Sequence, residues 1–262
     1  MLDASRILAG PFAAQILGEY GAEVLKIEPP SGDDTRHWGP PFQGPQSAYF
    51  QSCNRNKSSL VLDLEKASDR TRFNQLLAKA DIYLDNFLPH SQSKWGVDEA
   101  RLNRQFPRLV HGHISSFPVG HARAEEKGYD LALQAETGWI ALNGAPDDPV
   151  GSKVGVAVLD VLSGQMLANA LLAGLVKRLR TGQGCGVSVS LVQTALYCLV
   201  NVASNALVSG KPSQRWGNAH ANIVPYQDFA CRDGRLVLAI GNDRQFQSFC
   251  GVMGLGKNPI SQ

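Results

Sequence analysis

Short apolar runs and longer amphipathic stretches take turns along most of the chain. The apolar runs predict strands at 24–28, 82–86, 109–115 and 186–191. The amphipathic stretches predict helices at 11–20, 66–79, 162–180 and 192–208, with a further segment at 127–137. Because strands that alternate with helices usually pair in parallel, the pattern predicts an α/β fold, an open parallel Rossmann-like sheet flanked by helices.

A polar, turn-rich stretch at 210–217 interrupts this alternation and predicts a domain boundary. One strand at 235–241 and one helix at 243–253 follow it. We therefore expect a large α/β domain over 1–209, and over 210–262 a linker with the beginning of a smaller domain.

Composition narrows the range of functions. Of the 262 residues, 44% are hydrophobic and 18% charged, with a net charge of +2, which is typical of a soluble globular protein. The basic residues are dispersed, so we expect no nucleic acid as partner. No apolar segment approaches the roughly 20 residues of a membrane span, and the N-terminus does not resemble a signal peptide. We expect a cytoplasmic protein that acts away from membranes.

Cysteine and histidine patterns do not indicate a metal site. The five cysteines are widely spaced and form no Cys-x-x-Cys pair, which favours reduced thiols. His111 and His113 share one face of a predicted strand, and with no acidic or thiol ligand nearby they are interpreted as packed or surface side chains.

One carboxylate stands out in an apolar run. Asp160 lies in the stretch Val154–Gly164, directly before a predicted helix. At or near the N-cap, the helix dipole and free N–H groups would favour its charged form, which would make it available as a nucleophile at neutral pH. The alternative is that Asp160 only caps the helix, the commonest use of such an Asp.

Motifs of other chemistries are missing. No Gly-x-Gly-x-x-Gly opens the first helix, and neither a Walker loop nor a Gly-x-Ser-x-Gly elbow is present. The fold is nucleotide-binding in style, so function has to be inferred from the site.

Several blocks together resemble the family III CoA-transferases, also called the carnitine-dehydratase and bile-acid-inducible group. In the family's order they are 6–13, 21–28, 32–36, 54–58, 85–87, 127–130 and the Asp160 run. The later block 215–227 is most similar to the branch that moves CoA between dicarboxylic acids, such as the succinate and hydroxymethylglutarate enzyme.

The resemblance implies a catalytic role for Asp160. At the matching position the family has an Asp that attacks an acyl-CoA thioester, forming a mixed anhydride and then an aspartyl-CoA thioester. Acyl-CoA and a carboxylic acid, here expected to be dicarboxylic with a succinyl-CoA type donor, would be the substrates. No permanently bound cofactor and no metal is expected.

The resemblance also implies where CoA binds, along the carboxyl edge of the sheet. The matching positions are Leu8, Ala9, Leu62, Asp63, Leu64, Glu65, Asn86, Phe87, Lys94, Lys127, Gly128, Tyr129 and Asp130. For Leu62 and Phe87 the alternative is core packing, and for the two lysines surface charge.

A polar loop corresponds to the mobile glycine-rich loop that covers the acyl site in some family members. Gly217, Asn218 and His220 lie in it, and polar donors there would recognise the distal carboxylate of a dicarboxylic substrate. The alternative is a solvated interdomain turn.

The chain departs from the family pattern at both ends and in the CoA region. The first strand is expected to be clipped, and the segment that returns to the large domain is expected to be missing. In the family two ring-shaped subunits interlock, so a homodimer is expected by resemblance. Pro29 replaces a basic residue, Ser116-Phe-Pro118 replaces Gly-Tyr-Gly, and Glu65 stands where a Lys can meet a CoA phosphate.

Two alternatives to a CoA-transferase stay open. A 2-methylacyl-CoA racemase of the same fold would pair Asp160 with a His, but this chain has Tyr129, whose pKa of about 10 makes it a poor base. The other alternative is an inactive CoA-binding fragment, which would bind CoA without exchanging it.

Overall fold

The computed structural model describes residues 1–255, which fall into two compact units. Unit 1 comprises Met1–Thr137 and Gly155–Leu199, and unit 2 comprises Gly138–Val154 and the chain from Val200 onward. The second unit thus begins before the expected residue 210 and also takes in 138–154. Arg215 explains part of this difference, because its guanidinium donates to the carbonyl oxygens of Ala141 and Asp148.

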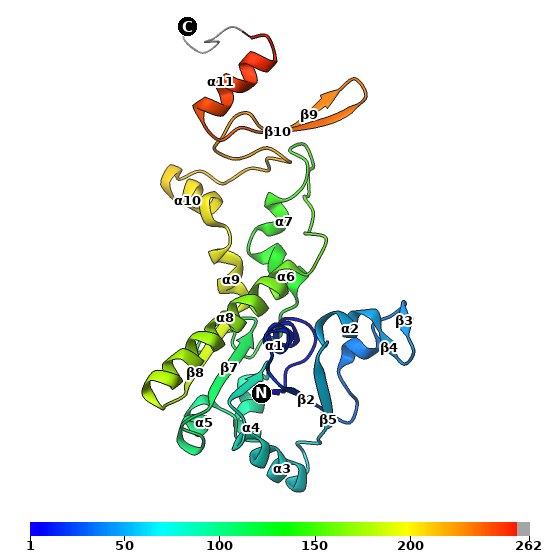
Figure 1. The fold of residues 1–262 in the computed structure, drawn as a ribbon, viewed down its shortest axis with the longest axis vertical. Coiled ribbons are helices and arrows are strands. Elements are labelled where there is room, and N and C mark those ends of the chain that lie inside the picture. The colour runs from blue at the N-terminus through cyan, green and yellow to red at the C-terminus, as the bar shows by residue number, and fades with distance from the viewer. Residues whose placement is uncertain (256–262) are drawn as a thin grey trace. The chain divides into compact units, whose positions relative to one another are not determined.

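A six-stranded parallel sheet forms the centre of unit 1 (Figure 1), as the alternation of strands and helices predicts. Its order is β5-β2-β1-β6-β7-β8, and Leu2 on β1 pairs with Leu25 and Tyr83. The strands are β1 (Leu2–Asp3), β2 (Val24–Glu28), β5 (Lys57–Val61), β6 (Ile82–Asp85), β7 (Val110–Ser115) and β8 (Cys185–Ser190).

Helices α1 (Ala9–Glu19) and α8 (Val158–Thr181) lie side by side against one face of the sheet (Figure 1). Small residues allow this close packing. A Cβ added to Gly164 would lie 2.5 Å from the carbonyl oxygen of Ala9, and one added to Gly174 would lie 2.7 Å from Val110. The beginning of α1 is therefore held directly against the first turns of α8.

The other face of the sheet carries the main hydrophobic cluster. Leu2, Ile27 and Tyr83 of the strands pack there with Phe73 of α3 (Ala67–Leu77) and Leu102 of α5 (Glu99–Gln105). Helix α4 (Pro89–Trp95) contributes Trp95, which meets Phe87 edge to face. With helices on both faces, unit 1 has the predicted α/β architecture.

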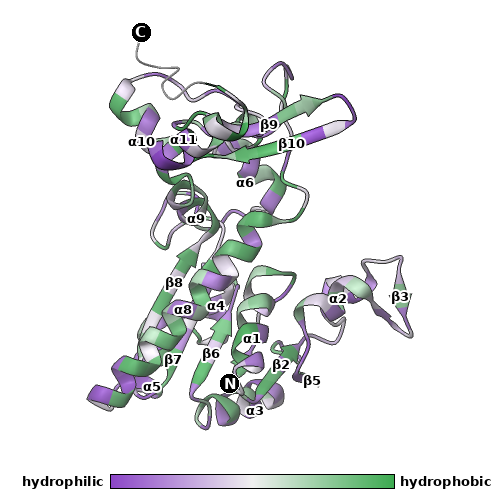
Figure 2. Ribbon diagram, turned by 45° about the horizontal axis from the view of Figure 1, so that its top comes forward, coloured by the Kyte–Doolittle hydropathy of each residue, from purple (hydrophilic) through white to green (hydrophobic). Residues whose placement is uncertain are grey.

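Helix α8 corrects the expectation that no segment approaches the length of a membrane span. Among residues 1–255, α8 has the length and the apolar composition that a helix needs to cross a membrane. The same holds for α9 (Leu191–Tyr197) and α10 (Val200–Ser209) if this bent pair is counted as one span. In the fold, however, α8 packs on α1, β7 and β8. Figure 2 shows hydrophobic and hydrophilic stretches alternating along it, as in a helix with one face on a sheet.

The other elements also refine the predicted boundaries. The helix expected at 192–208 is divided into α9 and α10, and the one expected at 162–180 begins four residues earlier, at Val158. Unit 1 also contains η1 (Asp34–His37), β3 (Phe42–Gln43), β4 (Gln46–Ser47), α2 (Ala48–Cys53) and α6 (Asp130–Glu136). Unit 2 contains α7 (Trp139–Leu142), α10, the hairpin β9 (Tyr226–Cys231) and β10 (Gly234–Ala239), and α11 (Asp243–Val252).

Candidate active site

A cavity of about 550 Å³ opens at the carboxyl edge of the sheet, entirely within unit 1. Segments at the ends of the strands form its wall: 6–9 after β1, 62–65 after β5, 86–88 after β6, and 115–116 at the end of β7. Open parallel sheets bind ligands at this edge, because the loops there diverge and leave a crevice.

Most of the residues predicted to bind CoA line this cavity. They are Leu8, Ala9, Leu62, Asp63, Leu64, Glu65, Asn86, Phe87, Lys127, Gly128 and Tyr129. Two predicted residues are not in the wall. Lys94 lies on α4 and its ammonium group forms an ion pair with Glu65 at 2.6 Å, while Asp130 is buried behind the wall.

Asp160 also lines the cavity, but it is not the cap of its helix. It occupies the first turn of α8, whose N-cap residue is Ala157 and has no side-chain hydrogen bond. The cap comes from a distant segment: one carboxylate oxygen of Asp130 accepts from the N–H of Leu159 at 2.7 Å and from that of Asp160 at 3.4 Å. The capping role considered for Asp160 is thus performed by Asp130.

The carboxylate of Asp160 is left without an assigned structural partner. Among residues 1–255 it forms no hydrogen bond or ion pair of its own, whereas Asp130 is further held by Gln134. Polar groups that are largely buried usually have partners, and those without one need an explanation. A nucleophile that must be free to react supplies one.

Burial, followed by the negative charge of Asp130, raises the pKa of Asp160 to about 7. This corrects the expectation that the helix N-terminus would favour the charged form of Asp160, because removing a carboxylate from water disfavours its charged form. A raised pKa at a cavity wall is a frequent property of reactive carboxylates.

Two local contacts shape the wall next to Asp160. Asn86 receives the N–H of Arg6 and donates to its carbonyl oxygen, both at 3.0 Å. Ser116 receives the N–H of Gly128 at 2.7 Å, and a Cβ on Gly128 would lie 2.9 Å from Ser116. The Ser116-Phe-Pro118 segment that departs from the family pattern therefore fixes the predicted 127–130 segment in place.

Sequence reasoning missed Tyr49, on α2. Burial and then the charge of Asp160 raise the pKa of its phenol to about 12, so the hydroxyl keeps its proton at neutral pH. Its ring also meets Trp38 edge to face. The sequence around Tyr49 looks like an ordinary short helix, so no local pattern indicated that this residue lies within the electrostatic reach of Asp160.

The predicted substrate residues Gly217, Asn218 and His220 all belong to unit 2. Within that unit, Nδ1 of His220 accepts the N–H of Asn222 at 3.0 Å, and the ring meets Tyr226 edge to face. The amide of Asn222 is bound by two asparagines of α10, Asn201 and Asn205. The loop is therefore an ordered turn whose His220 keeps Nε2 for another partner.

The two strand histidines have protein partners, and the partner of His113 is a carboxylate, which corrects the expectation that no acidic residue lies nearby. His111 contacts Asn103 at 3.0 Å, and His113 contacts Asp85 at 2.9 Å. No group of three or more potential metal ligands occurs in the described part of the chain.

Comparisons with known proteins agree with this geometry. A family model described as CoA-transferase family III matches residues 1–261. The chain is 38% identical over 257 residues to the succinyl-CoA:glutarate CoA-transferase of Mus musculus, covering 97% of this chain and 58% of that protein. It is 38% identical over 264 residues to the succinate–glutarate CoA-transferase of Agrobacterium fabrum, covering 98% and 66%.

A solved structure, a CAIB/BAIF family protein from Brucella suis, superposes with a TM-score of 0.84 at 38% identity, covering 100% of this chain and 70% of that one. This chain thus spans 58% to 66% of the length of the two relatives named above. The resemblance predicted from the sequence blocks is confirmed, and the chain belongs to the family III CoA-transferases.

Proposed function

We propose that this protein transfers CoA from an acyl-CoA to a free dicarboxylic acid, with Asp160 as the covalent nucleophile. The observation that carries the proposal is the Asp160 carboxylate, which lines the cavity and has neither a hydrogen bond nor an ion pair among residues 1–255. The helix cap that would otherwise occupy it is supplied by Asp130.

The reaction would proceed by four balanced exchanges at carbonyl carbons. Asp160 attacks the donor thioester, the C–S bond breaks, and CoA thiolate leaves behind a mixed anhydride. The thiolate then attacks the Asp160 carbonyl, which releases the donor acid and forms an aspartyl-CoA thioester. The acceptor carboxylate attacks that thioester and expels the thiolate again. A final attack by the thiolate on the acceptor's acyl carbon gives the new acyl-CoA and regenerates Asp160, with no net proton transfer.

The cavity suits this series of reaction steps because it would keep CoA close to Asp160 between them. Apolar wall residues such as Leu8, Leu62 and Phe87 are mixed with the polar Asn86 and Lys127. Water would hydrolyse the anhydride, so a site that encloses the reacting groups protects it.

Dicarboxylic acids are the favoured substrate class. The relatives from mouse and Agrobacterium fabrum are named for succinate and glutarate, and one from Acetobacter aceti, 35% identical, is an acetyl-CoA:oxalate CoA-transferase. All three acids carry two carboxylates. We assign recognition of the carboxylate that does not react to the polar loop of unit 2, with His220 as its first candidate.

Asp160→Asn is the decisive variant. We expect transfer from succinyl-CoA to glutarate to fall at least roughly 1,000-fold, because the amide cannot act as the nucleophile. Hydroxylamine trapping during turnover should label Asp160 in the parent and nothing in the variant. The matched control is Asp233→Asn, an exposed carboxylate in unit 2, which should leave the rate unchanged.

Four outcomes would count against the proposal. Unchanged transfer in Asp160→Asn, or hydroxylamine labelling at another residue, would move the nucleophile elsewhere. CoA binding by calorimetry without any transfer over a panel of small carboxylic acids would instead support the inactive CoA-binding module. Exchange of the α-proton of a 2-methylacyl-CoA without transfer would support the racemase.

A further inference from the structure

The turn Ser5–Ala9, which connects β1 to α1, contains a strained residue. Ile7 has a backbone φ of 74°, in the left-handed region. Residues with a branched β-carbon are rarely found there, because the side chain crowds the backbone. Ile7, Leu8 and Ala9 all line the cavity, so the strain is located in its wall.

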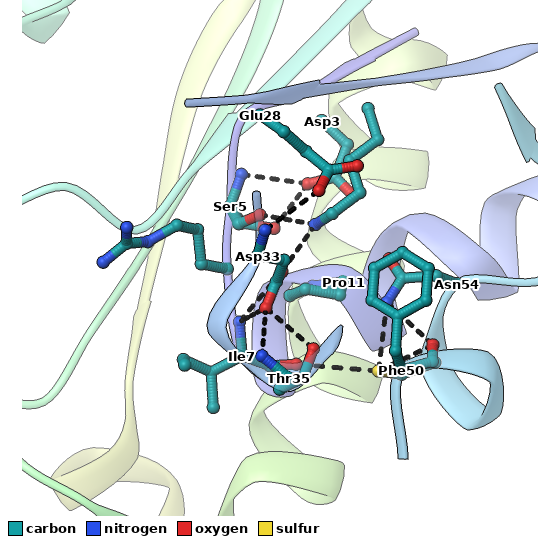
Figure 3. A network of polar contacts seen from close by, with 12 residues as sticks. Asp3, Ser5, Ile7, Pro11, Glu28, Asp33, Thr35, Phe50 and Asn54 are labelled. Atoms are coloured by element: carbon teal, nitrogen blue, oxygen red, sulfur yellow. Dashed lines mark hydrogen bonds and ion pairs between the residues drawn. The ribbon is translucent and has the colours of Figure 1, made fainter. Parts of the chain in front are cut away.

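A buried carboxylate holds this conformation. The N–H of Ile7 lies 3.4 Å and 3.3 Å from the two carboxylate oxygens of Asp33, a residue with no exposed surface. The same carboxylate accepts from the N–H of Thr35 at 3.0 Å and from its hydroxyl at 2.7 Å. Figure 3 shows the Asp33 carboxylate lying between Ile7 and Thr35, joined to both.

A buried lysine fixes Asp33 and the turn together. Nζ of Lys26 lies 3.0 Å from Asp33 and donates to the carbonyl oxygen of Ser5 at 2.8 Å, and both charged side chains are almost completely buried. The side chain of Asn86 forms hydrogen bonds with both the N–H and the carbonyl oxygen of Arg6. The backbone of residues 5, 6 and 7 is thus held by side chains from three separate segments.

A second buried pair completes the surroundings. Asp3 is paired with Lys57 at 2.9 Å and also accepts from the N–H of Ser5. Lys57 further donates to the carbonyl oxygen of Pro11 and to Asn54. Glu28 accepts the N–H of Asp33 at 2.9 Å.

Such a network is a costly way to gain stability. A buried ion pair can often be replaced by apolar side chains of similar volume without loss of stability, because the desolvation of two charges offsets their attraction. Strained residues persist where the surroundings over-determine them, and they cluster at functional sites. Because Ile7 lies in the cavity wall, we infer that its strained backbone conformation serves the function of the cavity.

We propose that Asp33, held by Lys26, is a positioning residue that keeps Ile7 in its left-handed conformation and so aims the backbone of Leu8 and Ala9 at the bound thioester. This rests on the proposed function for the identity of the ligand. The turn also sets the distance between the start of α1 and α8, since the carbonyl oxygen of Ala9 closely approaches Gly164, one turn after Asp160.

The test removes the pair without leaving a buried charge alone, in Lys26→Met/Asp33→Leu. We expect amide hydrogen exchange in the peptide that contains residues 5–10 to speed up and CoA affinity to fall about tenfold. The value of kcat/KM should fall roughly 100-fold, because displacing reacting groups by about 1 Å lowers the rate by about that factor. Adding Ile7→Gly should recover at least about tenfold of the loss, because glycine adopts a positive φ without being held there. If the double variant does not fold, Asp33→Asn takes its place, with the same recovery expected.

The control removes the other buried pair, in Lys57→Met/Asp3→Leu. Stability is expected to change there too, but Ile7→Gly should restore nothing, because that pair does not hold the Ile7 amide. Unchanged exchange and CoA affinity in the Asp33 variant, or no recovery with Ile7→Gly, would overturn the inference. A parent chain that fails to transfer CoA while the exchange of residues 5–10 still responds as described would refute the proposed function and leave the positioning role standing.

Discussion

At the scale of single residues, the reactivity proposed for Asp160 depends on the different roles of two carboxylates. Asp130 accepts the free N–H groups at the start of α8, and Asp160 keeps its own oxygens for the cavity. The arrangement raises the pKa of Asp160 through burial and through the charge of Asp130. Two neighbouring acids thereby acquire different tasks from their surroundings.

This predicts a pH dependence. Because the pKa of Asp160 is raised to about 7 and only the carboxylate attacks, kcat/KM should rise as the pH rises toward 7 and level off above it. Asp130→Asn keeps a capping oxygen but removes the negative charge, so the midpoint of the profile should move to lower pH. The measurement is the initial rate of CoA transfer between about pH 5 and pH 9.

A midpoint that stays in place in Asp130→Asn would show that burial alone sets the pKa of Asp160. A rate that falls as the pH rises through 7 would contradict a carboxylate nucleophile altogether. Thermal unfolding of both proteins at each pH separates these effects from a loss of the fold.

At the scale of elements, the sequence predicted the sheet well and the beginnings of its helices less well. Apolar runs marked four of the six strands, at 24–28, 82–86, 109–115 and 186–191, to within about a residue, because each of these strands has buried apolar positions. The start of α8 was missed by four residues, since its cap comes from Asp130, 30 positions away. No local pattern can reveal a cap supplied by a distant segment.

The same reasoning explains what could be predicted of the site. The sequence blocks shared with the family predicted most of the residues that line the cavity, because these blocks coincide with the loops after the strands. The direction of the Asp160 pKa shift was predicted wrongly, because burial is a property of the folded chain. The role of Asp33 was missed because a buried carboxylate and an exposed one look alike in sequence.

The crossing of α1 and α8 gives a prediction of its own. Gly164→Ala would place a Cβ 2.5 Å from the carbonyl oxygen of Ala9, so α8 would have to move away from α1. We expect a loss of roughly 1–3 kcal/mol in the free energy of unfolding, with a lower transfer rate as Asp160 moves. Chemical denaturation measures the first effect and the exchange assay the second.

Gly251→Ala on α11 is the matched control, because an added Cβ there meets nothing within 4 Å. It should be neutral or stabilise by up to about 1 kcal/mol, as a glycine replaced by alanine in a helix normally does. Equal effects of the two substitutions would show that the contact with Ala9 is not tight.

At the scale of the whole molecule, the residues proposed to bind CoA and those proposed to recognise the acid belong to different units. The cavity and Asp160 belong to unit 1, while the loop with Gly217, Asn218 and His220 belongs to unit 2. Binding of CoA and selection of the acid should therefore be separable by mutation. The homodimer expected from the family remains a prediction.

His220→Gln tests this separation. We expect the KM for a dicarboxylic acceptor to rise about tenfold, because a charge-assisted contact to its free carboxylate is lost. The dissociation constant for CoA should stay unchanged. Calorimetry with CoA and steady-state kinetics with glutarate provide the two values. A rise in the CoA dissociation constant instead would place His220 at the CoA site.

The cap that Asp130 supplies to α8 also affects whether the start of this helix would stay intact while Asp160 reacts. Each turnover would convert Asp160 in succession from an anion to a neutral anhydride, then a neutral thioester, and back again. If the Asp160 side chain also capped the helix, every acylation would break its hydrogen bonds to the backbone N–H groups. Each return to the free carboxylate would form them again. Because Asp130 supplies the cap and takes no part in the proposed reaction, the backbone N–H groups of Leu159 and Asp160 would keep the same hydrogen bonds in every covalent state.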